Sequence, residues 1–358
     1  MPTTLLIELL DRIRSPWVPL LGILLLSGCS SLDYYSQLAR GQMALLNARQ
    51  PVQALIDDTS QSQELRQRLA LTQEARTFAS GSLGLPDNGS YRVYADIQRP
   101  YVVWNLFATT EFSLQPETHC FPVAGCVAYR GYYQLGRARG AAALLRQQGL
   151  DTWVGGVEAY STLGWFDDPL LNTMLRWDDD RLAALIFHEL AHQRLYIPGD
   201  TAFNESFASF VEREGLKQWR ASRGLSIEAD DASIHRDALT RLVLDTRERL
   251  EQLYASGLPA ERMRLAKADA FERMRRDYRA MRDRDWGGYN RYDAWMEGPM
   301  NNAKLLPFGL YDQWVPAFAA LFGEAGGSWA AFYQRARELG ELPMEARTQA
   351  LERLMANR

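Results

Sequence analysis

Two histidines and a glutamate lie close together in the stretch FHELAHQRLYIPGDTAFNESFASFVEREG, which covers residues 187–215. His188 and His192 are four residues apart, so on a helix both imidazoles project from one face, one turn apart. Two imidazoles at this spacing can bind one metal ion. Glu189 would then face a water molecule at that ion and could act as a general base. The spacing therefore predicts a hydrolytic metal site.

A third ligand is available on the next expected helix. Glu205 lies thirteen positions after His192, beyond a proline–glycine turn, and two helices joined by such a turn can meet at a carboxylate. Two histidines and a glutamate are a common ligand set for catalytic zinc, which keeps one coordination position open. Glu212 and Glu214 are the alternative ligands in the same stretch.

Apolar neighbours favour a metal site over solvated histidines. The flanking residues predict a buried helix, in which imidazoles without partners would be costly; they are Leu185, Ile186, Phe187, Leu190 and Ala191. The chain has only four histidines, and two of them are here. The alternative is that His188 and His192 are hydrogen-bonded core residues. His119, beside Cys120 in an expected loop, and His235, on a charged expected helix, are not predicted as ligands.

The surrounding segments predict the elements that hold this site. Apolar periodicity predicts helices up to residue 90, strand-forming residues follow between 91 and 114, and another strand starts at Asp151. Residues 168–175 are expected to form a short helix. Asp178 precedes the histidine helix as its expected N-cap, and Thr201 starts the next helix. A long pair of helices is expected over residues 233–284.

These patterns predict an α+β, helix-rich fold with a small mixed sheet next to the histidine helix and a helical C-terminal section. No repeat or long linker divides the chain. Residues 29–358 are expected to form one unit. It would consist of a helical N-terminal section (29–90), a catalytic core (91–220) and a helical C-terminal section (221–358).

The composition is that of a soluble globular protein. Of the 358 residues, 47% are hydrophobic and 23% are charged, which is enough for a sizeable core. The formal charge is −4, with basic and acidic residues interspersed and no basic block. Nucleic acid is therefore not an expected partner.

The N-terminus has the pattern of a secretory signal. An apolar run over residues 17–26 follows Arg12 and Arg14 and is too short for a comfortable membrane span. It ends in Leu-Ser-Gly-Cys29, which resembles the lipobox of bacterial lipoproteins. This resemblance implies removal of residues 1–28 and acylation of Cys29, which would anchor the protein in the cell envelope. Ser30 replaces the aspartate that signals inner-membrane retention, so the outer membrane, facing the periplasm, is expected. The alternative is an uncleaved N-terminal anchor.

Two cysteines then remain, Cys120 and Cys126, in a compartment that permits disulfides. The loop between them, CFPVAGC, contains Pro122 and Gly125, which allow a tight bend. A disulfide is expected, and two buried free thiols are the alternative.

The stretch over residues 187–215 resembles the signature of a bacterial family of predicted zinc aminopeptidases, which belong to the gluzincin type of metallopeptidase. The segments CFPVAGCVAYRGYY, AYSTLGWFDDPLLNTML and NNAKL resemble the same family, so the similarity covers nearly the whole chain after Cys29. The resemblance implies one zinc ion held by His188, His192 and Glu205. It also implies Glu189 as the catalyst and a peptide as the substrate.

Gluzincin aminopeptidases carry a Gly-x-Met-Glu-Asn edge strand, whose backbone pairs with the peptide and whose glutamate binds the free amine. The sequence GGVEAY at residues 155–160 matches this strand in part, with Val157 and Ala159 in place of Met and Asn. The resemblance implies substrate binding by Gly155, Gly156 and Glu158. The alternative is that Glu158 is an ordinary strand glutamate.

These patterns favour a zinc-dependent peptidase at the cell envelope, either an aminopeptidase or an endopeptidase. The rival function is a lipid-anchored binding or scaffold protein that keeps the zinc helix only as architecture. Tyr160 and Tyr311 are candidates for the donor that stabilises an oxyanion, and packing is the alternative role for each.

Overall fold

A computed structural model describes residues 17–121, 125–159, 162, 166–227, 231–308 and 313–356, with side chains from residue 32 onward. The chain divides into two compact units, residues 1–48 and residues 49–358. The first contains helix α2 (Trp17–Asn47). Residues 1–16 of the expected signal and the side chain of Cys29 lie outside the described part. None of the described helices is both long and apolar enough to cross a membrane.

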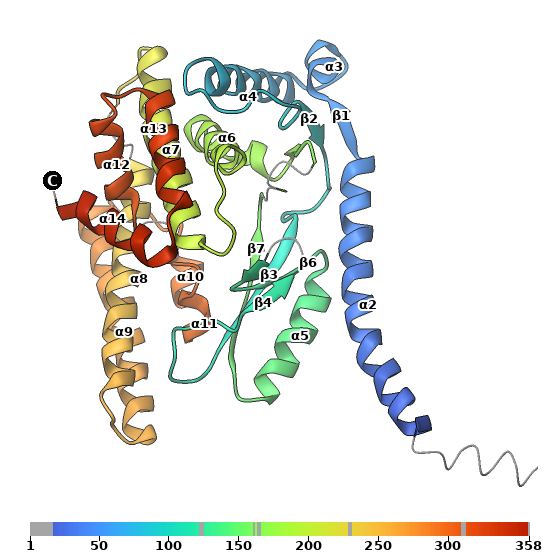
Figure 1. The fold of residues 1–358 in the computed structure, drawn as a ribbon, viewed down its shortest axis with the longest axis vertical. Helices are drawn as coiled ribbons and strands as arrows, with labels where there is room; N and C mark the ends of the chain where they lie inside the picture. The colour runs from blue at the N-terminus through green and yellow to red at the C-terminus, as the bar shows by residue number, and fades with distance from the viewer. Residues whose placement is uncertain are drawn as a thin grey trace, which may run out of the picture. The chain divides into compact units, whose positions relative to one another are not determined.

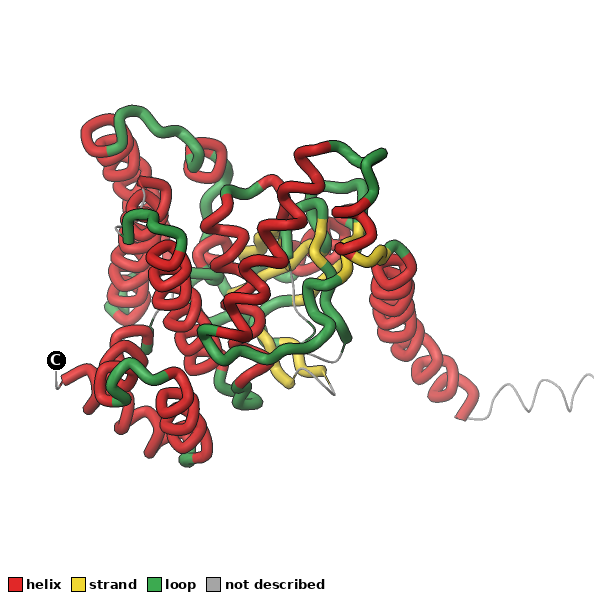
Figure 2. The backbone as a smooth tube through the Cα atoms, turned by 90° about the horizontal axis from the view of Figure 1, so that it is seen from above, coloured by secondary structure: helices red, strands yellow, loops and turns green. Residues whose placement is uncertain are grey.

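The second unit is helix-rich and contains short strands, which confirms the predicted α+β class (Figures 1 and 2). Its strands are β1 (Arg49–Pro51), β2 (Val93–Ala95), β3 (Val103–Thr109), β4 (His119–Phe121), β5 (Gly125–Val127), β6 (Arg130–Tyr132), β7 (Asp151–Val157) and β8 (Leu170–Leu171). Its longer helices are α4 (Gln63–Gly81), α5 (Leu135–Gln147), α6 (Asp179–Arg194), α7 (Thr201–Ser222), α8 (Asp231–Ala255), α9 (Ala260–Asp285), α12 (Val315–Glu324), α13 (Trp329–Glu341) and α14 (Met344–Ala356). Its short helices are α3 (Val52–Asp57), the 3-10 helix η1 (Met174–Arg176), α10 (Asp293–Glu297) and α11 (Asn302–Leu305).

The described strands form three small sheets. One is mixed and has the order β1-β2-β8, with β1 antiparallel and β8 parallel to β2. The second is antiparallel and has the order β6-β3-β7, so that β7 is an edge strand. Helix α5 packs against this sheet, and α11 contacts β7 (Figure 1). The third is the hairpin β4-β5.

Residues 168–175 were expected to form one short helix, and this prediction is wrong. Leu170 and Leu171 form strand β8, which pairs in parallel with Tyr94 and Ala95 of β2. Both leucines are buried. Only the next turn is helical, as η1. The two buried leucines gain ladder hydrogen bonds from a strand far away in sequence, and this pairing overrides the local helical spacing.

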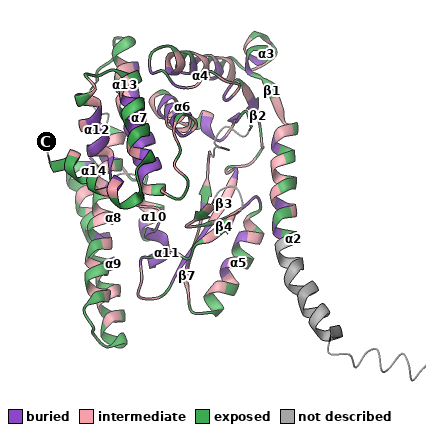
Figure 3. Cartoon of the chain, viewed as in Figure 1, coloured by how far each residue is buried: buried purple, intermediate pink, exposed green. Residues whose placement is uncertain are grey.

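Helices α6 and α7 pack against each other at the centre of the second unit, and α4 covers α6. Most side chains of α6 are buried or partly buried, whereas α9 is exposed along much of its length (Figure 3). Gly215 lets α7 approach its neighbours closely, because a Cβ atom at this position would lie 2.7 Å from Leu83 Cδ1 and 3.2 Å from the Phe187 ring. This close packing fixes the helix pair that carries the predicted ligands.

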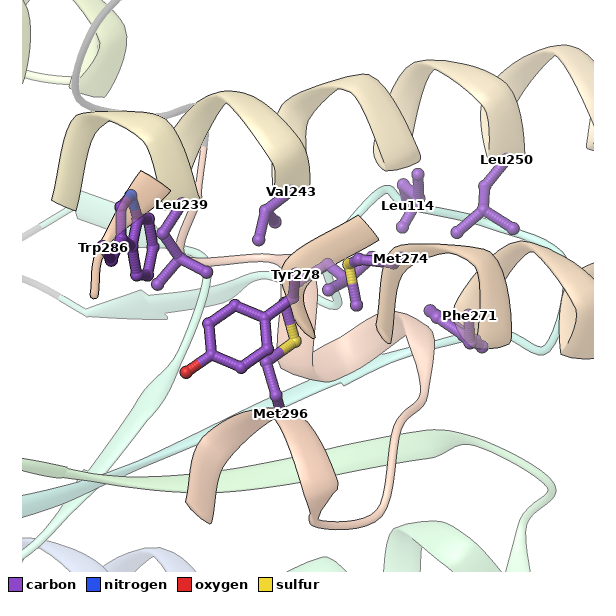
Figure 4. Packing of buried hydrophobic residues seen from close by; sticks show 10 residues of the cluster. Leu114, Leu239, Val243, Leu250, Phe271, Met274, Tyr278, Trp286 and Met296 are labelled. Atoms are coloured by element: carbon purple, nitrogen blue, oxygen red, sulfur yellow. The ribbon is translucent and has the colours of Figure 1, made fainter. Parts of the chain in front are cut away.

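Helices α8 and α9 form the long antiparallel pair that the sequence predicts (Figure 1). The turn between them contains Gly257, which has a left-handed φ of 69°, and Pro259, which is the N-cap of α9. Buried apolar side chains from both helices and from neighbouring segments meet along the contact (Figure 4). They include Leu239, Val243, Leu250, Phe271, Met274, Tyr278 and Met296.

Candidate metal centre

Helix α6 holds the two histidines. Asp178 caps its N-terminus, accepting a hydrogen bond at 2.7 Å from the backbone N–H of Arg181, and the acidic first turn suits the helix dipole. The histidines lie one turn apart, with ring centroids 4.8 Å apart. The Nε2 atoms of His188 and His192 face each other at 3.2 Å. This agrees with the spacing argument from the sequence.

Helix α7 brings Glu205 to the same place. Asp200 caps this helix, accepting a hydrogen bond from the backbone N–H of Phe203 at 3.0 Å. The side chain of Asn204 makes two hydrogen bonds with the backbone of Ile197, at 2.7 and 2.8 Å, and so fixes the turn between α6 and α7. Glu205 Oε2 then lies 3.4 Å from His188 Nε2 and 3.5 Å from the corresponding atom of His192.

The spacing of these three donor atoms fits a small divalent ion. In a tetrahedral site with bonds of about 2.1 Å, the ligand atoms are about 3.4 Å apart. The three separations here are 3.2, 3.4 and 3.5 Å. Glu205 Oε2 is buried and has no hydrogen-bond partner among the described residues. A bound cation would satisfy this oxygen, which would otherwise be a costly buried group.

The electrostatics of the site also favour a positive charge. Burial alone would lower the pKa of His188, but the adjacent carboxylates of Glu205 and Glu212 outweigh it, so that this pKa is raised well above its ordinary value. Burial would raise the pKa of Glu205, but the imidazoles of His188 and His192, 3.4 and 3.5 Å away, lower it to about 2. A metal ion supplies the same positive charge without requiring protonated ligands.

Glu212 contacts the opposite side of the first histidine. Its Oε2 lies 2.9 Å from Nδ1 of His188, whereas Nε2 of the same ring faces Glu205. A proton on Nδ1 that is donated to a carboxylate leaves Nε2 free to bind an ion. Glu214, the other alternative ligand, instead accepts a hydrogen bond from Gln218 at 2.8 Å. The sequence contained a signal for Glu212, because it follows Glu205 by seven positions and so lies on the same helix face.

No described group donates a hydrogen bond to the carboxylate of Glu189. Burial raises its pKa above the ordinary value; the charges of Glu205 and Asp168 add to this effect, while His188 and His192 oppose it. A raised pKa beside a candidate metal site is a property expected of a general base that later returns its proton.

Tyr91 lies near Glu189 and was not singled out by the sequence. Its side chain is buried, and its φ of 64° is left-handed, which costs a bulky residue about 1–3 kcal/mol. Its backbone N–H donates to Asp168 O at 2.7 Å, and this contact holds the strained turn. Burial raises the pKa of its hydroxyl, and the charges of Glu189 and Asp168 add to the effect. The tyrosine therefore stays neutral and can donate a hydrogen bond.

The edge strand β7 has backbone groups without hydrogen-bond partners among the described residues, at the place where the sequence suggested substrate binding. Val157 O accepts a hydrogen bond from the β3 side, and Thr152 O accepts one from Asn301 on the outer side. Because successive residues of a strand face opposite sides, Val154 and Gly156 also face outward. No described group bonds with their outward N–H and C=O groups.

The two glycines of β7 accommodate aromatic rings. A Cβ atom at Gly155 would overlap the Trp153 ring, and one at Gly156 would overlap the Tyr101 ring. Glu158 follows the strand, and its carboxylate accepts hydrogen bonds from Trp177 Nε1 at 2.9 Å and from the Arg181 guanidinium at 3.2 Å. The glutamate thus already has two donors.

The other residues named from the sequence are not part of the group of three candidate ligands. Cys120 and Cys126 face each other in the β4-β5 hairpin and form a disulfide, with an S–S distance of 2.00 Å. His119 lies in strand β4 beside this disulfide. His235 stacks on Trp286 at 4.6 Å in the α8–α9 region. Tyr160 and Tyr311 lie outside the described residues.

A family model described as "Putative aminopeptidase" matches residues 33–351, which is nearly the whole chain. No curated protein and no solved structure matches the chain.

Proposed function

The chain belongs to this family of putative aminopeptidases, and from this premise we propose that it is a zinc-dependent peptidase of the gluzincin type. In this proposal one zinc ion is held by His188, His192 and Glu205, and Glu189 is the general base. The substrate is a peptide, from which the enzyme removes residues at the N-terminus.

The observation that carries the proposal is the convergence of three donor atoms from two capped helices, with Glu189 next to the first ligand. Among the histidine, cysteine and acidic side chains in the described part of the chain, only His188, His192 and Glu205 bring three ligand atoms close enough to hold one metal ion. The set of two imidazoles and one carboxylate is typical of catalytic zinc rather than of calcium or magnesium, which prefer oxygen ligands.

When bound, zinc supplies Lewis-acid chemistry, which activates water and polarises the peptide carbonyl. The carboxylate of Glu189 accepts the proton of the attacking water and delivers it to the departing amine. Glu212 holds the His188 ring in the orientation that its role as ligand requires. Neutral Tyr91 helps to enclose Glu189 and to keep its pKa raised by excluding water.

The substrate backbone pairs with the open edge of β7 in this proposal. Val154 and Gly156 offer outward N–H and C=O groups, which can form a short ladder with an extended peptide. Gly155 and Gly156 leave room above the strand for the Trp153 and Tyr101 rings. Glu158 can accept a hydrogen bond from the free amine of the substrate through Oε1, because Trp177 and Arg181 both donate to Oε2.

Glu212→Gln is expected to weaken zinc binding by about 10- to 100-fold, the usual cost of removing a carboxylate that orients a ligating histidine. Competition with a zinc chelator measures this dissociation constant. Glu214→Gln is the matched control, because it lies two residues further along α7 and should bind zinc like the wild type. A wild-type dissociation constant for Glu212→Gln would show that His188 needs no such partner.

The proposal also places the protein at the cell envelope. Residues 1–28 are removed, Cys29 is acylated and residues 29–358 form the mature peptidase on the outer membrane, facing the periplasm. Each buried CH₂ of an acyl chain contributes about 0.8 kcal/mol to membrane binding, so several chains hold the protein permanently.

Cys29→Ala is expected to abolish lipid-dependent processing and to leave the protein unacylated. Mass spectrometry of the N-terminal peptide from the native host measures the modification. An unmodified mature Cys29 in the wild-type protein would contradict the lipoprotein assignment.

A mixed peptide library tests the proposed activity. The zinc-loaded protein should shorten peptides with free N-termini from that end and should spare the same peptides after N-acetylation. Internal cuts in both sets would identify an endopeptidase. A protein that binds zinc and cleaves neither set would be a scaffold, and the proposed function would be wrong.

A further inference from the structure

A pocket of about 300 Å³ opens beside the metal centre. It lies between the start of α6, the first half of α8 and the segment around α10. A second cavity, of about 180 Å³, is lined by His188 and Glu212. The two share Arg236 and Thr240, so they are neighbours. We call the larger cavity the arginine pocket.

Three guanidinium groups line the arginine pocket, from Arg181, Arg236 and Arg291. The first pairs with Glu158 at 3.2 Å. The other two form no ion pair with any carboxylate among the described residues. Burial lowers the pKa of Arg181, and the charges of Arg291 and Arg236 lower it further, although Glu158 raises it. Asp178 is the one carboxylate among the lining residues, and it also raises the pKa of Arg181. Three positive charges against this carboxylate and Glu158 leave the positive charge only partly neutralised.

The remaining lining distinguishes the pocket from an ordinary solvated charged surface. Leu239, Tyr292, Trp295 and Phe308 form apolar walls. Concave sites with apolar walls and a few convergent charged groups are typical of small-molecule and side-chain binding. Guanidinium groups bind carboxylates in two-pronged hydrogen-bond geometry, and low-polarity walls strengthen such bonds.

The pocket is within reach of a peptide bound at the metal centre. Arg181 precedes His188 by seven residues, so the two lie on the same face of α6, about 10 Å apart along the helix axis. An extended peptide covers this distance with about three residues. Arg236 lines both this pocket and the cavity that His188 lines.

We propose that the arginine pocket binds a carboxylate of the peptide substrate, two or three residues from the bond that is cleaved. The inference rests on the proposed peptidase function and specifies its substrate class. The carboxylate can come from the C-terminus of a short peptide or from an acidic side chain. In both cases Arg236 and Arg291 supply guanidinium groups that form no ion pair with a described carboxylate, and the apolar walls contact the adjoining carbon atoms.

Calorimetric binding to the zinc-loaded Glu189→Gln variant tests this proposal without depending on turnover. The probes are tetra-alanine acid, tetra-alanine amide, and the amide of Ala-Ala-Glu-Ala. At least one carboxylate-bearing probe should bind about 10- to 100-fold more tightly than tetra-alanine amide, since hydrogen bonds to charged groups have this strength. Preference for tetra-alanine acid identifies the C-terminus as the source, and preference for the glutamate peptide identifies the side chain.

The added substitutions Arg236→Gln and Arg291→Gln should remove this preference. Arg241→Gln is the matched control, because it is exposed on α8 and lies outside the pocket. Equal binding of all three probes, no binding of any probe, or a preference that survives the double substitution would overturn the inference. Failure of the proposed function gives a different result, in which the wild-type protein binds these peptides but does not cleave them.

Discussion

Glu189→Gln is expected to lower kcat/KM for peptide hydrolysis by about 10²- to 10⁴-fold, the range that general acid–base catalysis contributes. The amide has nearly the shape of the carboxylate but cannot take a proton from water. Because Glu189 is not one of the three converging ligands, the variant should keep one zinc ion per chain. Steady-state kinetics on a peptide from the library, together with elemental analysis, measures both quantities.

Glu214→Gln controls for the loss of a partly buried carboxylate near the site, and it should keep wild-type kinetics. Unchanged hydrolysis by Glu189→Gln would show that another group is the base. Loss of zinc together with activity would show instead that Glu189 supports the metal site.

His188→Ala and Glu205→Ala are each expected to lose zinc and therefore activity. Each removes one of three protein ligands, so the loss of affinity should exceed the roughly 10- to 100-fold cost of removing an orienting partner. In His188→Ala, Glu205 and Glu212 also lose the imidazole that lies between them. Chelator competition and elemental analysis give the affinity and the stoichiometry.

His235→Ala is the matched histidine control, because His235 stacks on Trp286 and is not one of the three candidate ligands. It should keep zinc even if its stability changes. Full zinc content in Glu205→Ala would show that Glu205 is not a ligand. Glu212 would then be the candidate for the third ligand.

The candidate metal centre could be predicted from the sequence because its geometry is mainly local. His188 and His192 lie on one helix, and a short turn leads to Glu205, so helical spacing was sufficient to group them. Asp178 and Asp200 mark the starts of the two helices as caps. The contact of Glu212 with His188 follows from the same periodicity, although its role depends on which ring nitrogen it meets.

Features that depend on distant segments could not be predicted in this way. Strand β8 exists because Leu170 and Leu171 pair with β2, and their local spacing had suggested a helix. The role of Gly155 becomes clear only from the Trp153 ring that covers it. The arginine pocket combines residues from three separate segments, and no spacing in the sequence relates them.

Zinc titration of the metal-free protein tests the central claim most directly. Protein stripped with a chelator should hydrolyse no peptide, and activity should rise linearly with added zinc and reach its plateau at one equivalent per chain. Activity in the stripped protein, or none at any zinc concentration, would contradict the account.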